Sequence, residues 1–160
     1  MEPNAQLKAA YEQDQEDRKH GSLSLYRDAQ RIKLVRSLLE QNKLKNAEDY
    51  YRAALIMQHG QDSDHYKQAI ALAKKAVLLK PNHKQARWLA CATEDRYLHS
   101  IGRPQVWGTQ FVGTFEYSLE PFDRHAKTDQ ERIANNIPPL QEILRQLRAM
   151  NNALTEEQSE

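Results

Sequence analysis

Three polar residues near the start of the chain have a spacing that suits a site on a helix. Asp14 and Arg18 are four positions apart, and Gln15 lies beside Asp14. Side chains four apart share one face of a helix, so Asp14 can pair with or orient Arg18. The alternative is an exposed ion pair within the helix, worth only about 0.3–0.5 kcal/mol.

A second candidate is the imidazole of His59, which stands between Gln58 and Gly60 where a helix is expected to end. The partial negative charge at a helix C-terminus favours a protonated imidazole. A histidine there is able to act as an acid or a base near neutral pH. The alternative is a histidine that only caps the helix.

The third group is Asp95, Arg96 and His99. Asp95 and His99 are one helical turn apart, and a carboxylate beside an imidazole sets its tautomer and raises its basicity. Arg96 offers a planar fork that matches a carboxylate or a phosphate. The same arginine can instead bond a buried carboxylate or the backbone, so a site and a scaffold both fit.

The fourth group is the polar segment 105–110. Gly108 permits the backbone to approach a ligand closely, and Trp107 can form an apolar wall. Gln105, Thr109 and Gln110 offer hydrogen-bond donors and acceptors. A purely structural turn would have a similar sequence.

Familiar catalytic motifs are missing from the sequence, which has no phosphate-cradling glycine loop, no Gly-x-Ser-x-Gly elbow and no His-Glu-x-x-His pair. His59, Asp62, Asp64 and His65 are close in sequence, but they spread over a helix end and a loop, which is weak support for a metal. We therefore predict no metal and no cofactor.

The elements that must position these groups are mainly helices. Polar capping residues, apolar spacing and the prolines predict five helices, over about 5–19, 22–42, 46–59, 62–80 and 84–100. A capping box at Thr128 to Glu131 predicts a short sixth helix, and Pro139 opens a last one. Between the fifth and sixth helices, 108–120 favours a short β-hairpin.

One stretch is similar to a known repeat. Residues 69–79, the turn Lys80-Pro81-Asn82-His83 and Ala86 resemble the second helix and the turn of a tetratricopeptide repeat. The likeness covers about one repeat. We therefore expect a mainly α fold of antiparallel helix pairs in a tetratricopeptide-like stack, as one domain over 1–150 with a disordered tail over 151–160.

Composition narrows the classes of partner. The 160-residue chain carries 23 Lys and Arg against 22 Asp and Glu, so no strong field draws it to nucleic acid or to an anionic membrane. Basic residues such as Arg31 and Arg36 are read as the solvated face of an amphipathic helix. The single cysteine, Cys91, excludes an intrachain disulfide, and without a signal or membrane span we expect a cytoplasmic protein.

The four polar groups, in this order, resemble a bacterial family of domains of unknown function. The likeness extends over nearly the whole domain and rests on Asp14 to Arg18, Gln58-His59, Asp95-Arg96, 102–105, 108–111, Arg132 and 137–140. The resemblance implies that these polar elements recur together, as a shared site would. This chain has Trp107 where a tyrosine is usual and Ile137 where Gly-Leu is common, and the family brings no settled activity.

Taken together, these observations predict a polar pocket that acts on a small polar or anionic molecule by acid-base chemistry, of hydrolase or of lyase or cyclase type. His59, Asp95 and Asp14 are the expected catalytic groups. The expected substrate-binding residues are Arg18, Gln15, Arg96, Gln105, Trp107, Thr109 and Gln110. The alternative is a tetratricopeptide-like interaction module that binds a protein partner without catalysis.

Overall fold

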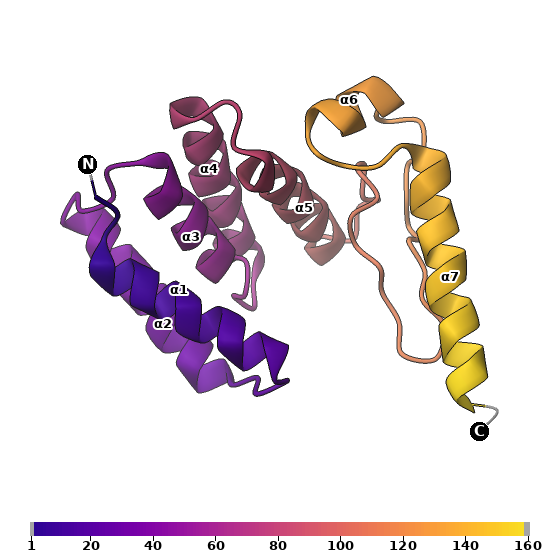
Figure 1. Ribbon diagram of the computed structural model, residues 1–160, viewed down its shortest axis with the longest axis horizontal. Coiled ribbons are helices and arrows are strands. Elements are labelled where there is room, and N and C mark those ends of the chain that lie inside the picture. Colours follow the sequence, from indigo (N-terminus) through magenta and orange to yellow (C-terminus); the bar gives the residue numbers. More distant parts are fainter. Residues whose placement is uncertain (1, 159–160) are drawn as a thin grey trace.

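The computed structural model describes residues 2–158, and it is built from helices (Figure 1). Within these residues the helices are α1 (Ala5–Lys19), α2 (Leu25–Glu40), α3 (Ala47–Met57), α4 (Ser63–Leu79), α5 (Lys84–Ser100), α6 (Asp129–Ala134) and α7 (Leu140–Gln158). The mainly helical fold expected from the sequence is confirmed, and the first and fifth helices match the expected bounds. None of the described helices is long and apolar enough to cross a membrane.

Capping side chains explain where the helices begin. Asn4, Ser24, Asn46 and Asp62 each accept a hydrogen bond from a backbone amide one turn into the following helix. Such caps satisfy donors that have no partner within the helix. The capping box at Thr128 is present as predicted.

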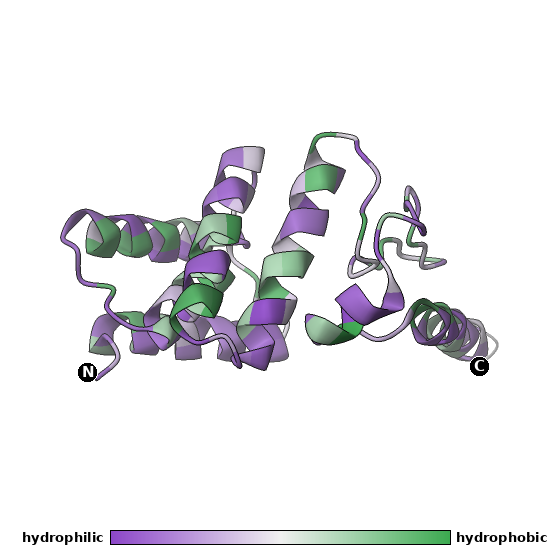
Figure 2. Cartoon of the chain, turned by 90° about the horizontal axis from the view of Figure 1, so that it is seen from above, coloured by the Kyte–Doolittle hydropathy of each residue, from purple (hydrophilic) through white to green (hydrophobic). Residues whose placement is uncertain are grey.

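Helices α1 to α5 share one apolar core. Helix α4 packs between α3 and α5, and Ala53, Ala54, Ala69 and Ala73 on α3 and α4 are fully buried. These small side chains let the helix backbones approach closely. Larger residues, among them Leu7, Val35, Leu38 and Leu89, fill the rest of the core. Figure 2 shows apolar and polar positions interspersed along the helices, the pattern of amphipathic helices.

The C-terminal part forms a second core beyond α5. Trp107, Phe122, Ile137 and Ile143 pack with Cys91 of α5. Helices α6 and α7 and the long connection before them therefore lie on the far side of α5 from α1 and α2 (Figure 1).

The expected β-hairpin is not formed, because no strand occurs in the described residues and Val112 and Ser118 make only an isolated antiparallel bridge. Val112 is 43% exposed and Phe115 is 86% exposed. Phe111 and Leu119, near the ends of the segment, pack on the second core, whereas its exposed tip has no apolar surface to rest on, so the pairing ends after one bridge.

Helix α7 continues to Gln158, past the start of the tail expected over 151–160, and 159–160 lie outside the described residues. Asn151 explains part of this order. Its side chain accepts a hydrogen bond from the amide of Tyr117 at 2.7 Å and donates one to the carbonyl of the same residue at 3.0 Å. The middle of α7 is thereby tied to the connection between α5 and α6.

Candidate functional site

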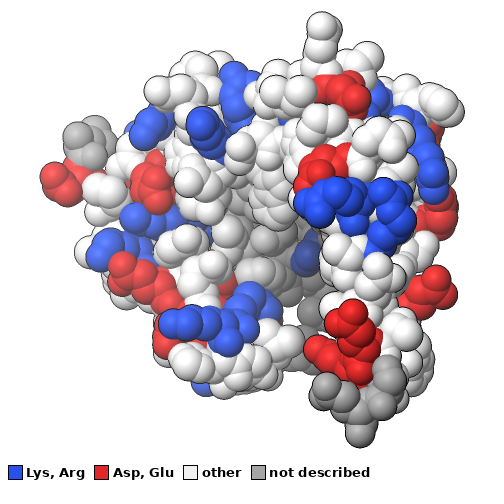
Figure 3. Space-filling model, turned by 45° about the vertical axis from the view of Figure 1, so that its right-hand side comes forward, with Lys and Arg blue, Asp and Glu red and all other residues white. Residues whose placement is uncertain are grey.

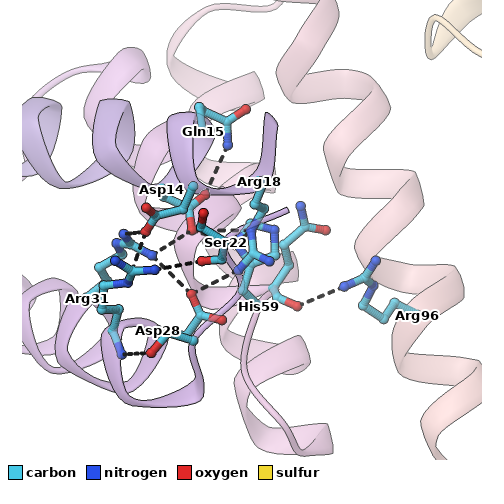
Figure 4. A network of polar contacts seen from close by, with 12 residues as sticks. Asp14, Gln15, Arg18, Ser22, Asp28, Arg31, His59 and Arg96 are labelled. Carbon is cyan, nitrogen blue, oxygen red and sulfur yellow. Dashed lines mark hydrogen bonds and ion pairs between the residues drawn. The ribbon is translucent and has the colours of Figure 1, made fainter. Parts of the chain in front are cut away.

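A buried carboxylate anchors a cluster of charged side chains between α1 and α2 (Figure 4). Asp14 is fully buried, and its Oδ1 lies 3.3 Å from Nε of Arg18 and 3.5 Å from Nη1 of Arg31. Gln15 donates to the other oxygen at 3.0 Å. A buried carboxylate needs such partners to offset the loss of hydration. The sequence-predicted trio of Asp14, Gln15 and Arg18 is therefore together.

Two further aspartates complete this cluster. Asp28 accepts from Nη2 of Arg18 at 2.9 Å and from Nη1 of Arg31 at 3.2 Å. Asp17 pairs with Arg31 and, at 3.3 Å, with Nε of Arg27. Three arginines and three aspartates thus balance in formal charge.

Burial alone raises the pKa of Asp14, but the hydrogen bond and charge of His59 and the charge of Arg18 outweigh it. The net result is a pKa below the ordinary value of 3.8. Asp14 therefore stays ionised at neutral pH and offers a fixed negative charge to the groups around it.

His59 joins the cluster from the end of α3. Its Nδ1 lies 2.9 Å from Nε of Arg18 and 3.1 Å from Oδ1 of Asp14. The planar guanidinium fixes the direction of the Nε–H of Arg18, which points to Nδ1. In this arrangement Nδ1 accepts, so the proton of a neutral imidazole lies on Nε2. If Arg18 turns away, Nδ1 can instead carry the proton and donate it to Asp14.

The other imidazole nitrogen is open. Nε2 of His59 makes no hydrogen bond to any described residue, and it is not among the buried polar atoms that lack a partner. His59 lines two adjoining pockets, of about 640 Å³ and about 250 Å³. Nε2 is therefore the atom of this imidazole that is free to meet a bound molecule.

Helix α5 forms part of the wall of the smaller pocket. Arg96 lines it together with Tyr66 and Ser24, and Nη1 of Arg96 donates to the carbonyl of Gln58 at 3.2 Å. No carboxylate of a described residue lies within 4.0 Å of this guanidinium. Burial lowers the pKa of Arg96, the charge of Arg18 lowers it further, and Tyr66 opposes both. Arg96 is thus a cation without a counter-ion at the pocket wall.

A glycine shapes the wall that the two pockets share. A Cβ on Gly60 would lie 2.3 Å from Cγ of His65, because the His65 ring packs directly on this glycine. Both residues line the larger pocket. The wall therefore depends on the absence of a side chain at position 60.

Asp95 lies elsewhere and holds a loop. This fully buried carboxylate accepts from the amides of Val106, Trp107 and Thr109 at 2.8–3.0 Å and from the Thr109 hydroxyl at 2.8 Å. Burial raises the pKa of Asp95, and these hydrogen bonds partly oppose the rise. The expected pairing of Asp95 with His99 is not formed, because the loop supplies all of the hydrogen bonds that the carboxylate makes.

The other residues of the fourth group also fix this loop. Buried Gln105 donates to the carbonyl of Gln110 at 2.9 Å and accepts from its amide at 3.0 Å. Gln110 donates to the Ala92 carbonyl on α5, and Nε1 of Trp107 donates to Glu94 at 2.8 Å. The structure does not bring Asp95, Gln105, Trp107, Thr109 or Gln110 to the two pockets beside His59.

Sequence reasoning missed several residues of the site. Arg31 was assigned to a solvated helix face, yet it is only 6% exposed, because α1 covers it and supplies Asp14 and Asp17 as partners. The spacing of Asp28 and Arg31, three apart on α2, was the available signal. Tyr66 and Gly60 gave none.

Comparisons of the chain with protein-family models, with curated proteins and with solved structures gave no match. Among the described residues, no group of three or more His, Cys, Asp or Glu side chains is placed to hold a metal ion. On the face seen in Figure 3, Lys and Arg side chains are interspersed with Asp and Glu.

Proposed function

We propose that this protein binds a small anionic molecule in the pockets beside His59 and transforms it by acid-base chemistry, as a hydrolase or as a lyase or cyclase. One observation carries the proposal. His59 is held at Nδ1 by Arg18 and Asp14, while its Nε2 bonds to no described residue and the side chain lines both pockets. An oriented imidazole with one open nitrogen is the arrangement that general acid-base catalysis requires.

Each charged neighbour has a role in this proposal. Asp14 orients the imidazole and stabilises its protonated form, in the place where the sequence also offered Asp95. Arg18 sets the resting tautomer, so that Nε2–H donates to a bound molecule. Arg96 supplies the positive charge that attracts the anion.

Proton transfer follows from the two arrangements of the cluster. Arg18 first releases Nδ1, which then takes a proton from solvent and donates to Asp14. The resulting imidazolium gives its Nε2 proton to a leaving or developing oxyanion, which leaves a neutral imidazole whose Nε2 is a base aimed at the same position. Asp14 contacts both groups, so it supports either state.

A thermal-shift screen with small carboxylates, phosphates and amino-acid derivatives tests the proposal, with turnover of each hit followed by proton NMR. We expect hits to stabilise the native protein, to lose at least half of their shift with Arg96→Lys, and to be converted by the native protein but not by His59→Ala. His125→Ala, an exposed histidine, is the matched control. Hits whose thermal shift is unchanged by Arg96→Lys and whose turnover is unchanged by His59→Ala would contradict the proposal.

A protein-interaction module is the second candidate. The observation that favours it is a group of exposed apolar side chains beside the smaller pocket, with Leu23 67%, Leu25 69% and Tyr26 73% exposed. In this reading α3, α4 and α5 form a tetratricopeptide-like stack whose polar groups serve only to fix it. Loss of partner capture with Leu25→Asp, together with no conversion of any small molecule, would favour it.

The setting that we propose is the cytoplasm. The single cysteine, Cys91, is buried, and burial raises the pKa of its thiol to about 12, which keeps it unreactive in a reducing compartment. The interspersed charges of the surface give nucleic acid no extended basic face to bind on the side seen in Figure 3. Cell fractionation with an antibody to the native protein tests this location.

A further inference from the structure

The two pockets beside His59 differ in size and chemistry although they share a wall. Asp28, His59, Gly60 and Gln61 line both of them. The smaller adds Arg18, Tyr66 and Arg96, and the larger adds residues of α2 such as Ala29 and Ile32. A molecule that fills both pockets would lie against the residues that they share, His59 among them.

One edge of the Arg96 guanidinium has no protein partner among the described residues. Its Nη1 is occupied by the Gln58 carbonyl, whereas Nε and Nη2 make no hydrogen bond to any described residue. Neither atom is among the buried polar atoms that lack a partner, so solvent reaches both. Nε and Nη2 form one side of the planar fork, and their two parallel N–H groups match the two oxygens of a carboxylate.

The charge of the site fits a single negative charge. The cluster of Arg18, Arg27 and Arg31 is balanced by Asp14, Asp17 and Asp28, so among the described residues that line the smaller pocket Arg96 is the cation that has no ion pair. A second negative charge in the smaller pocket would lie beside Asp28, with no cation left to compensate it. A monoanion is therefore favoured over a dianion.

The larger pocket suits an extended and partly apolar body. Its volume of about 640 Å³ falls in the range of pockets that hold drug-sized molecules. Ala29 and Ile32 line its floor on α2, while Lys33, Arg36 and Glu40 contribute aliphatic stems below their charged ends. Hydrocarbon in this pocket would be removed from water against these apolar surfaces.

Resting on the function proposed above, we infer that the ligand is an extended monocarboxylate. Its carboxylate occupies the smaller pocket on the Nε and Nη2 edge of Arg96, and its body passes over His59 into the larger pocket. The bond that joins the carboxylate-bearing part of the ligand to its body then lies next to Nε2. In an N-acylated amino acid this bond is the amide.

Isothermal titration calorimetry with three probes tests the two halves separately. N-acetylglycine carries the carboxylate with almost no body, N-octanoylglycine carries both, and N-octanoylglycinamide lacks the charge. We expect N-octanoylglycine to bind at least tenfold more tightly than either of the others, since each buried methylene tightens binding by about fourfold. Octyl phosphate at pH 8, where it is a dianion, should bind more weakly than N-octanoylglycine.

Two variants locate the halves. Arg96→Met should weaken N-acetylglycine and N-octanoylglycine by a similar factor of at least tenfold. Ala29→Phe, at an exposed position on the wall of the larger pocket, should weaken only N-octanoylglycine. Arg148→Met on α7 and Ala71→Phe on α4, both at exposed positions that line neither pocket, are the matched controls and should leave binding unchanged.

The outcomes separate this inference from the function on which it rests. N-acetylglycine that binds through Arg96 with no gain from the octanoyl chain would overturn the extended ligand and leave the acid-base proposal standing. Tighter binding of octyl phosphate than of N-octanoylglycine would overturn the monocarboxylate. If no probe binds the native protein, the inference is wrong, and the screen of small anions then decides the proposed function by itself.

Discussion

The Nδ1 atom of His59 lies 3.1 Å from Oδ1 of Asp14, although 45 positions separate the two residues along the chain. Asp14 is fully buried, and the His59 side chain is only 12% exposed. The contact joins α1 to the end of α3 at the point where two pockets meet. It also gives a buried carboxylate a partner on a second element, so folding and the site depend on the same pair.

Asp14→Asn should lower the free energy of unfolding by about 3 kcal/mol at pH 7, because it leaves the charges of Arg18 and Arg31 without a buried counter-ion. Urea denaturation measures the change. Glu12→Gln is the control, since the Lys8–Glu12 pair is more than half exposed and its loss should have little effect. If the two substitutions lowered the free energy of unfolding equally, Asp14 would contribute no more to stability than an exposed ion pair does.

The cost of Asp14→Asn should depend on pH. The pKa of Asp14 is lower in the folded protein than its ordinary value of 3.8, so the unfolded chain takes up a proton first as the pH falls. The stabilisation is complete above 3.8 and is lost as the pH falls through the folded pKa. The gap in stability between native protein and variant should therefore be constant near neutral pH and narrow below 3.8. A gap that widens on acidification would show that folding raises the pKa of Asp14 instead of lowering it.

Asp95→Asn should disturb the loop and spare the pockets. Three backbone amides and one hydroxyl donate to this carboxylate, and a carboxamide has one oxygen to receive them. A loss of about 3 kcal/mol in stability is expected, since donors left unsatisfied cost about 1–3 kcal/mol each. Hydrogen exchange should accelerate at Val106, Trp107 and Thr109. If hydrogen exchange at these amides were unchanged while Asp95→Asn abolished ligand binding in the pocket lined by Arg96, Asp95 would belong to the site.

Gly60→Ala should destabilise the protein by about 1–3 kcal/mol, because the new methyl group would overlap the His65 ring. His65→Ala removes the obstacle. In a double-mutant cycle the combined variant should therefore be more stable than the sum of the single changes predicts, by at least about 0.5 kcal/mol. Additive changes would show that this contact does not limit position 60.

Arg18→Met should change the tautomer of His59. With the Nε–H of Arg18 gone, Nδ1 no longer accepts from the guanidinium and is free to donate to Asp14. The nitrogen-15 shifts of the imidazole should then show the proton on Nδ1, whereas the native protein carries it on Nε2 when neutral. The same tautomer in both proteins would exclude Arg18 as the group that sets it. Arg145→Met, on exposed α7, is the control.

The sequence alone determined the helices and the types of residue that meet in the site. Capping side chains such as Asn4, Asp62 and Thr128, together with apolar spacing, are local signals, and they fixed where most helices begin. Asp14, Arg18 and His59 were selected because their chemistry and spacing suit a helix face and a helix end. Local spacing also suggested a hairpin at 108–120, which is not formed because the tip of this segment, with Val112 and Phe115, is exposed and packs on no core.

Only the tertiary structure decided which polar groups share a site. Asp14 and Asp95 look alike in sequence, since each is an acid just before an arginine or within one turn of it. The approach of α2 and the end of α3 gave Asp14 the partners Arg31 and His59, whereas the long connection after α5 wrapped its amides around Asp95. Burial and hydrogen bonding between elements depend on how the helices stack. The spacing of residues along the chain does not say which helices come close together.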